Sequence, residues 1–87
     1  MKLIRTKRFK RDYKKLPPQI QKRTDEKLRY LASDITHPSL RIQKVKKYKE
    51  ILEGSITMSY RFLFQITPEG YTLLRRETTR QLLHAAA

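Results

Sequence analysis

The sequence predicts an α+β domain in which a two-helix hairpin packs on a small, mostly antiparallel four-stranded sheet, in the order β-α-α-β-β-β. Apolar residues recur with helical spacing between residues 6 and 35 and alternate with strand spacing between 48 and 76, and prolines and other turn formers separate these segments. A chain of 87 residues without internal repeats or linkers has room for one domain, which we assign to residues 1–87.

The N-terminal half predicts a short strand followed by two helices. Residues 2–5 form the strand candidate, and Thr6 has a side chain that can cap the next helix. The apolar stripe of that helix is Phe9, Tyr13 and Leu16. Pro17-Pro18 ends it, and Pro18 suits the first turn of a second helix, expected over about 18–33. The short connection predicts an antiparallel hairpin.

The C-terminal half predicts three strands. Residues 48–56 and 60–66 alternate between two faces, and the Thr67–Gly70 turn leads into a return strand over 71–76. Consecutive Arg75 and Arg76 must point to opposite faces of the sheet. Because helices cover only one face of such a sheet, we expect an open face. It would carry Arg61, Glu53 and one of the two arginines.

The charge predicts an anionic partner. The chain has 21 Lys+Arg and 8 Asp+Glu, a formal net charge of +13, and a pI near 10.4. Residues 1–30 alone carry +9, and every basic residue after Gly54 is an arginine. Such a chain is expected to bind a polyanion or an acidic protein. A solvated basic surface that only keeps the protein soluble is the bland alternative.

Several classes of protein are excluded by what the sequence lacks. There is no cysteine, no signal-peptide pattern and no apolar run of membrane-spanning length, so we expect a cytoplasmic protein without a membrane partner. The acidic residues and the two histidines have no metal-ligand spacing, and two glycines cannot form a phosphate loop. We therefore expect neither a metal nor another cofactor.

Cations can still support one kind of chemistry. RNA carries its own nucleophile, the 2′-OH, so a metal-free nuclease needs only to align the backbone, stabilise the phosphorane charge and move two protons. Arg61 is the best candidate for the phosphate, and Glu53 is a candidate base. Lys46, Lys47 and Lys49 are candidates for holding the RNA backbone. The alternatives stay open: Arg61 as a surface arginine paired with Glu53 or Glu77, and the lysines as a solvated run.

Three segments resemble a known family. They are RTKRFKRDYKKLPPQIQKR at 5–23, HPSLRIQKVKKYKEI at 37–51 and SYRFLFQITPEGYTLLRR at 59–76. In this order and spacing, over residues 1 to about 80, the chain resembles the RelE/ParE superfamily of type II toxin–antitoxin toxins. The resemblance implies the β-α-α-β-β-β fold and a cognate antitoxin with an acidic segment. It also implies metal-independent cleavage of mRNA on the ribosome for the RelE branch, or inhibition of DNA gyrase for the ParE branch.

The family motifs map onto individual residues. Arg61 matches the strand arginine assigned to the scissile phosphate, Glu53 the acidic position of the W-E-A-R-I strand, and Arg75 and Arg76 the pair that ends the last strand. The sequence departs from the family at two other positions. Ser55 replaces a common second arginine, and Arg80 stands where close relatives have a histidine; a guanidinium binds phosphate but does not readily exchange protons.

The sequence thus predicts a toxin that inhibits translation as a ribosome-associated mRNA endoribonuclease and is neutralised by its antitoxin. The expected catalytic residues are Arg61, Glu53, Arg76 and Arg80, and the expected RNA-binding residues are Lys10, Lys14, Lys44, Lys46, Lys47, Lys49 and Arg75. Two alternatives remain: a gyrase inhibitor, and an attenuated toxin that only binds RNA and antitoxin. The missing histidine, with no tyrosine after Tyr71, motivates the second.

Overall fold

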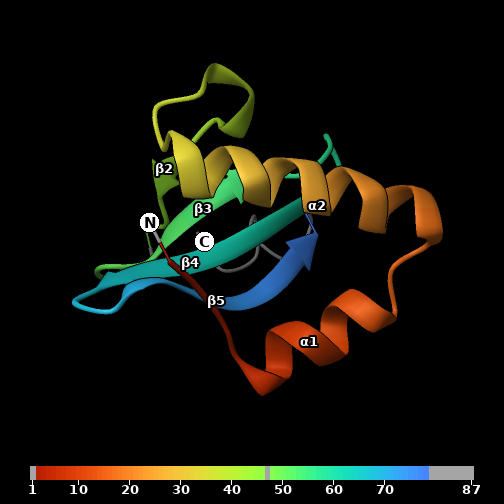
Figure 1. Cartoon of the computed structure of the whole chain (residues 1–87), viewed down its shortest axis with the longest axis horizontal. Helices are drawn as coiled ribbons and strands as arrows, with labels where there is room; N and C mark the ends of the chain where they lie inside the picture. Colours follow the sequence, from red (N-terminus) through yellow and green to blue (C-terminus); the bar gives the residue numbers. More distant parts are fainter. Residues whose placement is uncertain (1, 47, 79–87) are drawn as a thin grey trace.

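A computed structural model describes residues 2–46 and 48–78 of the chain. Its elements, in order, are β1 (Leu3–Arg5), α1 (Lys7–Lys14), α2 (Pro18–Ser33), the 3-10 turn η1 (Pro38–Leu40), β2 (Gln43–Lys44), β3 (Leu52–Ser55), β4 (Tyr60–Thr67) and β5 (Gly70–Thr78). The strands form one sheet in the order β1-β5-β4-β3-β2 (Figure 1). The predicted α+β class and helix hairpin are confirmed.

The sheet has five strands rather than the predicted four. The additional strand is β2, whose two residues pair antiparallel with Glu53 and Leu52 of β3. Both β2 side chains are exposed, so the segment has no buried face and therefore no apolar alternation to reveal it. The sheet is also mixed, because β1 pairs parallel with β5 while the other pairs are antiparallel.

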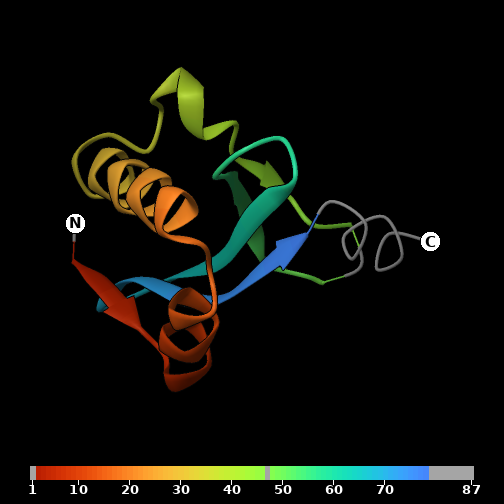
Figure 2. The ribbon, with the colours of Figure 1, turned by 90° about the vertical axis from the view of Figure 1, so that its right-hand side faces the viewer.

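The two helices pack on the same face of the sheet (Figure 2). Phe9 of α1 and Leu28 and Leu31 of α2 form the core with strand residues that include Phe62 and Phe64. These aromatic side chains are fully buried. The predicted bounds of the second helix, 18–33, are confirmed, with Pro18 in its first turn.

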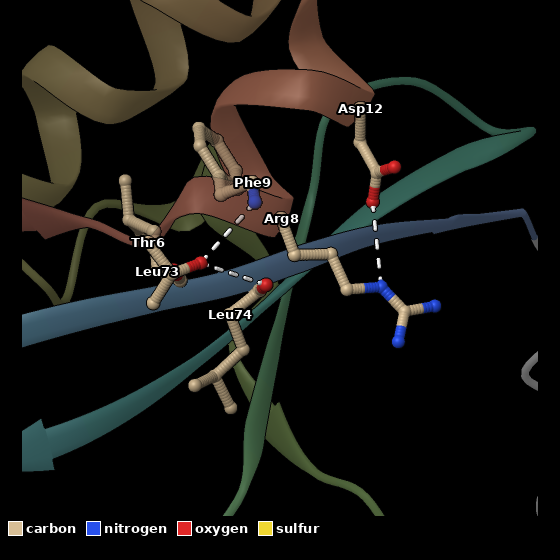
Figure 3. Close-up of polar contacts among 6 residues, drawn as sticks. All are labelled: Thr6, Arg8, Phe9, Asp12, Leu73 and Leu74. Carbon is tan, nitrogen blue, oxygen red and sulfur yellow. Dashed lines mark hydrogen bonds and ion pairs between the residues drawn. The ribbon is translucent and has the colours of Figure 1, made fainter.

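Thr6 joins α1 to the sheet at an irregularity in β5 (Figure 3). Its hydroxyl accepts a hydrogen bond from the Phe9 N–H at 3.2 Å, which confirms the predicted cap. The same hydroxyl lies 2.8 Å from the carbonyl oxygen of Leu73 and 3.1 Å from that of Leu74. The β4–β5 register shifts at this point, so that Leu74 has no partner in β4.

The bulge at Leu74 decides which arginine shares a face with Arg61. Beyond it, Arg75 lies opposite Leu63 and Arg76 lies opposite Phe62. Cross-strand partners lie on the same face, and Leu63 shares its face with Arg61 through strand alternation. Arg75 is therefore on the face of Arg61, whereas Arg76 is on the face covered by the helices.

The second face of the sheet is not open, contrary to expectation. Leu63 is 1% exposed and Glu53 is 7% exposed. The predicted strand over 48–56 begins only at Leu52, because the segment before it makes turns instead. Tyr48 and Ile51 of that segment line a hollow together with Leu63. Alternation alone indicates which residues share a face, but not which segments cover that face.

Candidate functional site

A groove of about 630 Å³ is lined by residues of α2, of η1 and of the turn that joins β3 to β4. Figure 2 shows how these three segments are arranged. Of the described residues that line the groove, four are cations and none is acidic. The cations are Arg23, Lys27, Arg41 and Arg61, and we call this feature the cationic groove. The hydroxyl groups of Ser39, Ser55 and Thr57 also line it. Its composition suits a bound anion.

Arg61 is held in place by the turn beside it. Its Nη1 donates to the carbonyl oxygen of Tyr60 at 3.1 Å, to Ser55 Oγ at 3.3 Å and to the carbonyl oxygen of Thr57. Ser55 lies directly opposite Arg61 in the β3–β4 register. All three contacts use one nitrogen of a group with five N–H donors. Within the described part of the chain, the donors on Nε and Nη2 are left for a ligand.

The other three cations come from α2 and from the end of η1. Arg23 and Lys27 are four residues apart in α2, so they lie on one face of the helix. Lys27 Nζ donates to the carbonyl oxygen of Ser39 at 3.1 Å, which ties α2 to η1. Arg41 follows η1 with φ 48° and ψ 49°, in the left-handed region. The sequence-based prediction missed all three residues.

Glu53 lies near Arg61 in the sheet but does not line the groove. It is opposite Leu63, two pairs along from Ser55 and Arg61, and therefore diagonal to Arg61 on the same face. Its carboxylate accepts a hydrogen bond from the side-chain amide of Gln43. Among the described contacts, the partner of Glu53 is thus Gln43 rather than Arg61.

Arg75 and Arg76 do not line the groove, and each lies over an aromatic ring. The Arg75 guanidinium is 5.7 Å from the ring centroid of Tyr48, and that of Arg76 is 5.9 Å from the centroid of Tyr60. Arg76 Nε is buried without a hydrogen-bond partner in the part of the chain that the structure describes. Arg80 and Lys47, also predicted as site residues, lie outside the described residues.

The predicted RNA-binding lysines occupy two other regions. Lys10 and Lys14, on α1, line a hollow between the two helices. Lys44 and Lys49 line another hollow, which borders β2, and Lys46 lies exposed between them in the chain. The structure therefore brings none of these five into the cationic groove.

The hollow between the helices contains a polar link. Tyr13 donates its hydroxyl to both carboxylate oxygens of Asp25, at 2.9 and 3.0 Å. Burial raises the pKa of Tyr13, and the hydrogen bond to Asp25 raises it further. The phenol therefore stays neutral and keeps donating to Asp25 beyond its ordinary titration range near pH 10.

The described residues form no group of three His, Asp or Glu that could hold a metal ion. In the same part of the chain, no helix has the length and apolar character needed to cross a bilayer.

Comparison with known proteins places the fold. No protein-family model and no curated protein matches the sequence. Solved structures do match. The RelB–RelE antitoxin–toxin complex from Methanococcus jannaschii aligns with 18% identity and a TM-score of 0.74, over 93% of this chain and 95% of that chain. The YoeB/ParE toxin from Agrobacterium tumefaciens aligns with 15% identity and a TM-score of 0.74, over 90% and 98%.

A third match is the toxin–antitoxin complex RelBE2 from Mycobacterium tuberculosis, with 25% identity and a TM-score of 0.62 over 87% of this chain and 94% of that chain. All three similarities cover most of this chain and nearly all of the other. The resemblance noted in the sequence is thereby confirmed in the fold, because this chain has the same fold as the RelE and YoeB/ParE toxins in these structures.

Proposed function

We propose that this protein is the toxin of a toxin–antitoxin module, a metal-independent mRNA endoribonuclease that acts on the ribosome and is neutralised by a cognate antitoxin. The observation that carries the proposal is the cationic groove: Arg61, the residue that the family resemblance assigns to the scissile phosphate, lines it with three more cations. The similar structures from Methanococcus jannaschii and Mycobacterium tuberculosis are toxin–antitoxin complexes, which supports an antitoxin partner.

In the proposed reaction, the RNA supplies the nucleophile. The 2′ oxygen attacks the adjacent phosphorus, the bond to the 5′ oxygen breaks, and a 2′,3′-cyclic phosphate and a 5′-hydroxyl result. Negative charge accumulates on the phosphoryl oxygens in the transition state. Arg61 is fixed by its Nη1 contacts and presents its remaining donors to that charge without reorganising.

Two protons must also move. The proton of the 2′-OH goes to a base, and the leaving 5′ oxygen receives one. We retain Glu53 as the proposed base, since it lies on the face of Arg61 and is the carboxylate that β3 and β4 carry. To act, its carboxylate must exchange the Gln43 amide for the 2′-OH. Arg80 and Arg76 remain proposed phosphate ligands.

The exposed lysines are proposed to dock the protein. Lys10 and Lys14 on α1, and Lys44, Lys46 and Lys49 near β2, would contact ribosomal RNA or the acidic segment of the antitoxin. Lys47, which lies outside the described residues, and Arg75 are proposed to act with the second group. Lysines bind phosphates as mobile point charges, which suits contacts that need no fixed geometry.

The test is induced expression in a bacterial host, with protein synthesis measured by pulse labelling. We expect the wild-type protein to stop protein synthesis and the Arg61→Ala variant to leave its rate unchanged. Arg29→Ala, which removes an exposed arginine of α2 that does not line the groove, is the matched control and should remain toxic. A DNA-damage response with normal translation would assign the protein to gyrase instead. RNA binding without toxicity would indicate an attenuated toxin.

A further inference from the structure

We propose that Arg23 and Arg41 form a second phosphate site in the cationic groove, which holds the single-stranded RNA next to the bond that Arg61 acts on. This inference rests on the proposed function, because it assigns a substrate contact to the same groove. It adds two binding residues from α2 and the end of η1, outside the strand motif that indicated Arg61.

The four cations of the groove differ in the hydrogen bonds that they make within the protein. Arg61 and Lys27 donate to backbone carbonyl oxygens of Thr57, Tyr60 and Ser39. Arg23 and Arg41 are exposed, and their guanidinium groups have neither an ion pair nor a hydrogen bond with any described residue. These two planar guanidinium groups have no carboxylate among the residues that line the groove, so they suit the bidentate binding of phosphate.

The backbone at Arg41 supports a role for its side chain. A left-handed conformation is unfavourable for a residue with a Cβ, and glycine or asparagine is the usual choice at such a position. Here the residue that ends η1 adopts φ 48° and still carries a guanidinium, which lines the groove. Conformations of this kind gather at ligand-binding positions, where the surrounding structure maintains them.

Phosphates of single-stranded RNA fit the groove better than a protein segment does. The other cations line the same groove as Arg61, so an RNA strand with one phosphate at Arg61 can place its neighbouring phosphates against α2 and the end of η1. The hydroxyl groups of Ser39 and Thr57 line the same wall and can hydrogen-bond to sugar or phosphate oxygens. An acidic peptide is the competing ligand, and the experiment separates the two.

The probe is a single-stranded RNA of about eight nucleotides, within the range of known site sizes, with 2′-O-methyl groups that block cleavage. Its affinity is measured by fluorescence anisotropy between about 50 and 200 mM salt. Arg23→Gln and Arg41→Gly should each weaken binding about tenfold at low salt and lower the salt slope by about 0.7, the value for one lost phosphate contact on a single strand. Arg29→Gln, which removes the same charge from α2 outside the groove, should have less than about a twofold effect.

Arg41→Gly also separates binding from folding. Glycine accepts the left-handed conformation, so the variant should melt no lower than the wild type. Glu50→Gly is the backbone control: Glu50 is the other non-glycine residue described with positive φ, at 67°, and it does not line the groove. It should leave the salt slope unchanged.

The outcomes distinguish failure of the second phosphate site from failure of the proposed function. If Arg61→Ala weakens binding but Arg23→Gln and Arg41→Gly behave like Arg29→Gln, the second phosphate site is wrong and the proposed function stands. A wild-type protein that does not bind the probe at the lowest salt contradicts the proposed function as well. An oligoglutamate of equal charge that displaces the probe at equal concentration would assign the groove to an acidic protein segment.

Discussion

The Thr6 hydroxyl connects the first turn of α1 with the bulge in β5. It accepts from Phe9 N–H and lies within hydrogen-bond distance of two carbonyl oxygens, although it has a single hydrogen to donate. This group therefore both caps the helix and anchors it to the sheet. Placement of α1 on the edge formed by β1 and β5 depends on it.

Replacing Thr6 by valine keeps the shape of the side chain and removes the hydroxyl. We expect the free energy of unfolding to fall by about 1–2 kcal/mol, from the lost cap and the unpaired carbonyl oxygen. Urea unfolding measures the change, and Thr6→Ser, which retains the hydroxyl, is the control. Equal stability of the valine variant and the wild type would show that the hydroxyl does not hold the helix.

Single residues also show the limit of inference from sequence. The Thr6 cap was predictable because it depends on its immediate neighbours. The sequence did not predict that Arg75 rather than Arg76 shares the face of Arg61. The bulge at Leu74 reverses the alternation of side chains, and no sequence pattern indicates the bulge. Arg23 and Lys27 had helical spacing, but only the packing of η1 and the β3–β4 turn against α2 reveals a groove.

Among the elements, β3 and β4 pack closely where Gly54 meets Phe62. The two residues are directly opposite, and a Cβ on Gly54 would lie 2.2 Å from Cζ of the Phe62 ring. The ring therefore occupies the space above the glycine. This contact fixes the ring on the helix side of the sheet, one residue away from Arg61.

Gly54→Ala should displace the buried ring and lower the free energy of unfolding by about 1–3 kcal/mol, the cost of overpacking. Thermal unfolding of the variant measures it, with Ser59→Ala in the exposed β3–β4 turn as the control. Adding Phe62→Leu relieves the clash, so the double variant should be more stable than the sum of the two single effects predicts. Strict additivity would contradict the steric explanation.

Elements with a buried stripe were predictable, and those without one were not. The bounds of α2 follow from its prolines and its apolar spacing, and β4 follows from alternation. The strand β2 is two residues long and both of its side chains are exposed. Its sequence therefore has no apolar pattern that predicts its pairing with β3. The segment at 48–51 alternates like a strand but forms turns, with Glu50 at φ 67°.

At the scale of the whole molecule, the charge of +13 divides into surfaces of different kinds. Lysines occupy exposed positions on α1 and near β2, where they are suited to docking. Arginines predominate in the cationic groove, where Arg61 is fixed by its neighbours. High net charge alone predicted an anionic partner, and the structure places the groove arginines apart from the exposed lysines of α1 and of the segment near β2.

This division predicts a steep salt dependence. If binding to a ribosomal RNA fragment neutralises about six phosphates, affinity should fall about a thousandfold between 50 and 200 mM salt. Filter binding across that range measures the slope. A flat response would mean that the positive surface serves a protein partner instead.

Arg61 is proposed to lie in an RNA-cleaving site. Primer extension on mRNA from cells expressing the protein tests it most directly, because it maps cuts at nucleotide resolution. We predict discrete cuts within translated codons for the wild type and for Arg29→Ala, and none for Arg61→Ala at equal protein level. Intact mRNA in the wild-type culture, or an unchanged set of cuts with Arg61→Ala, would contradict the account.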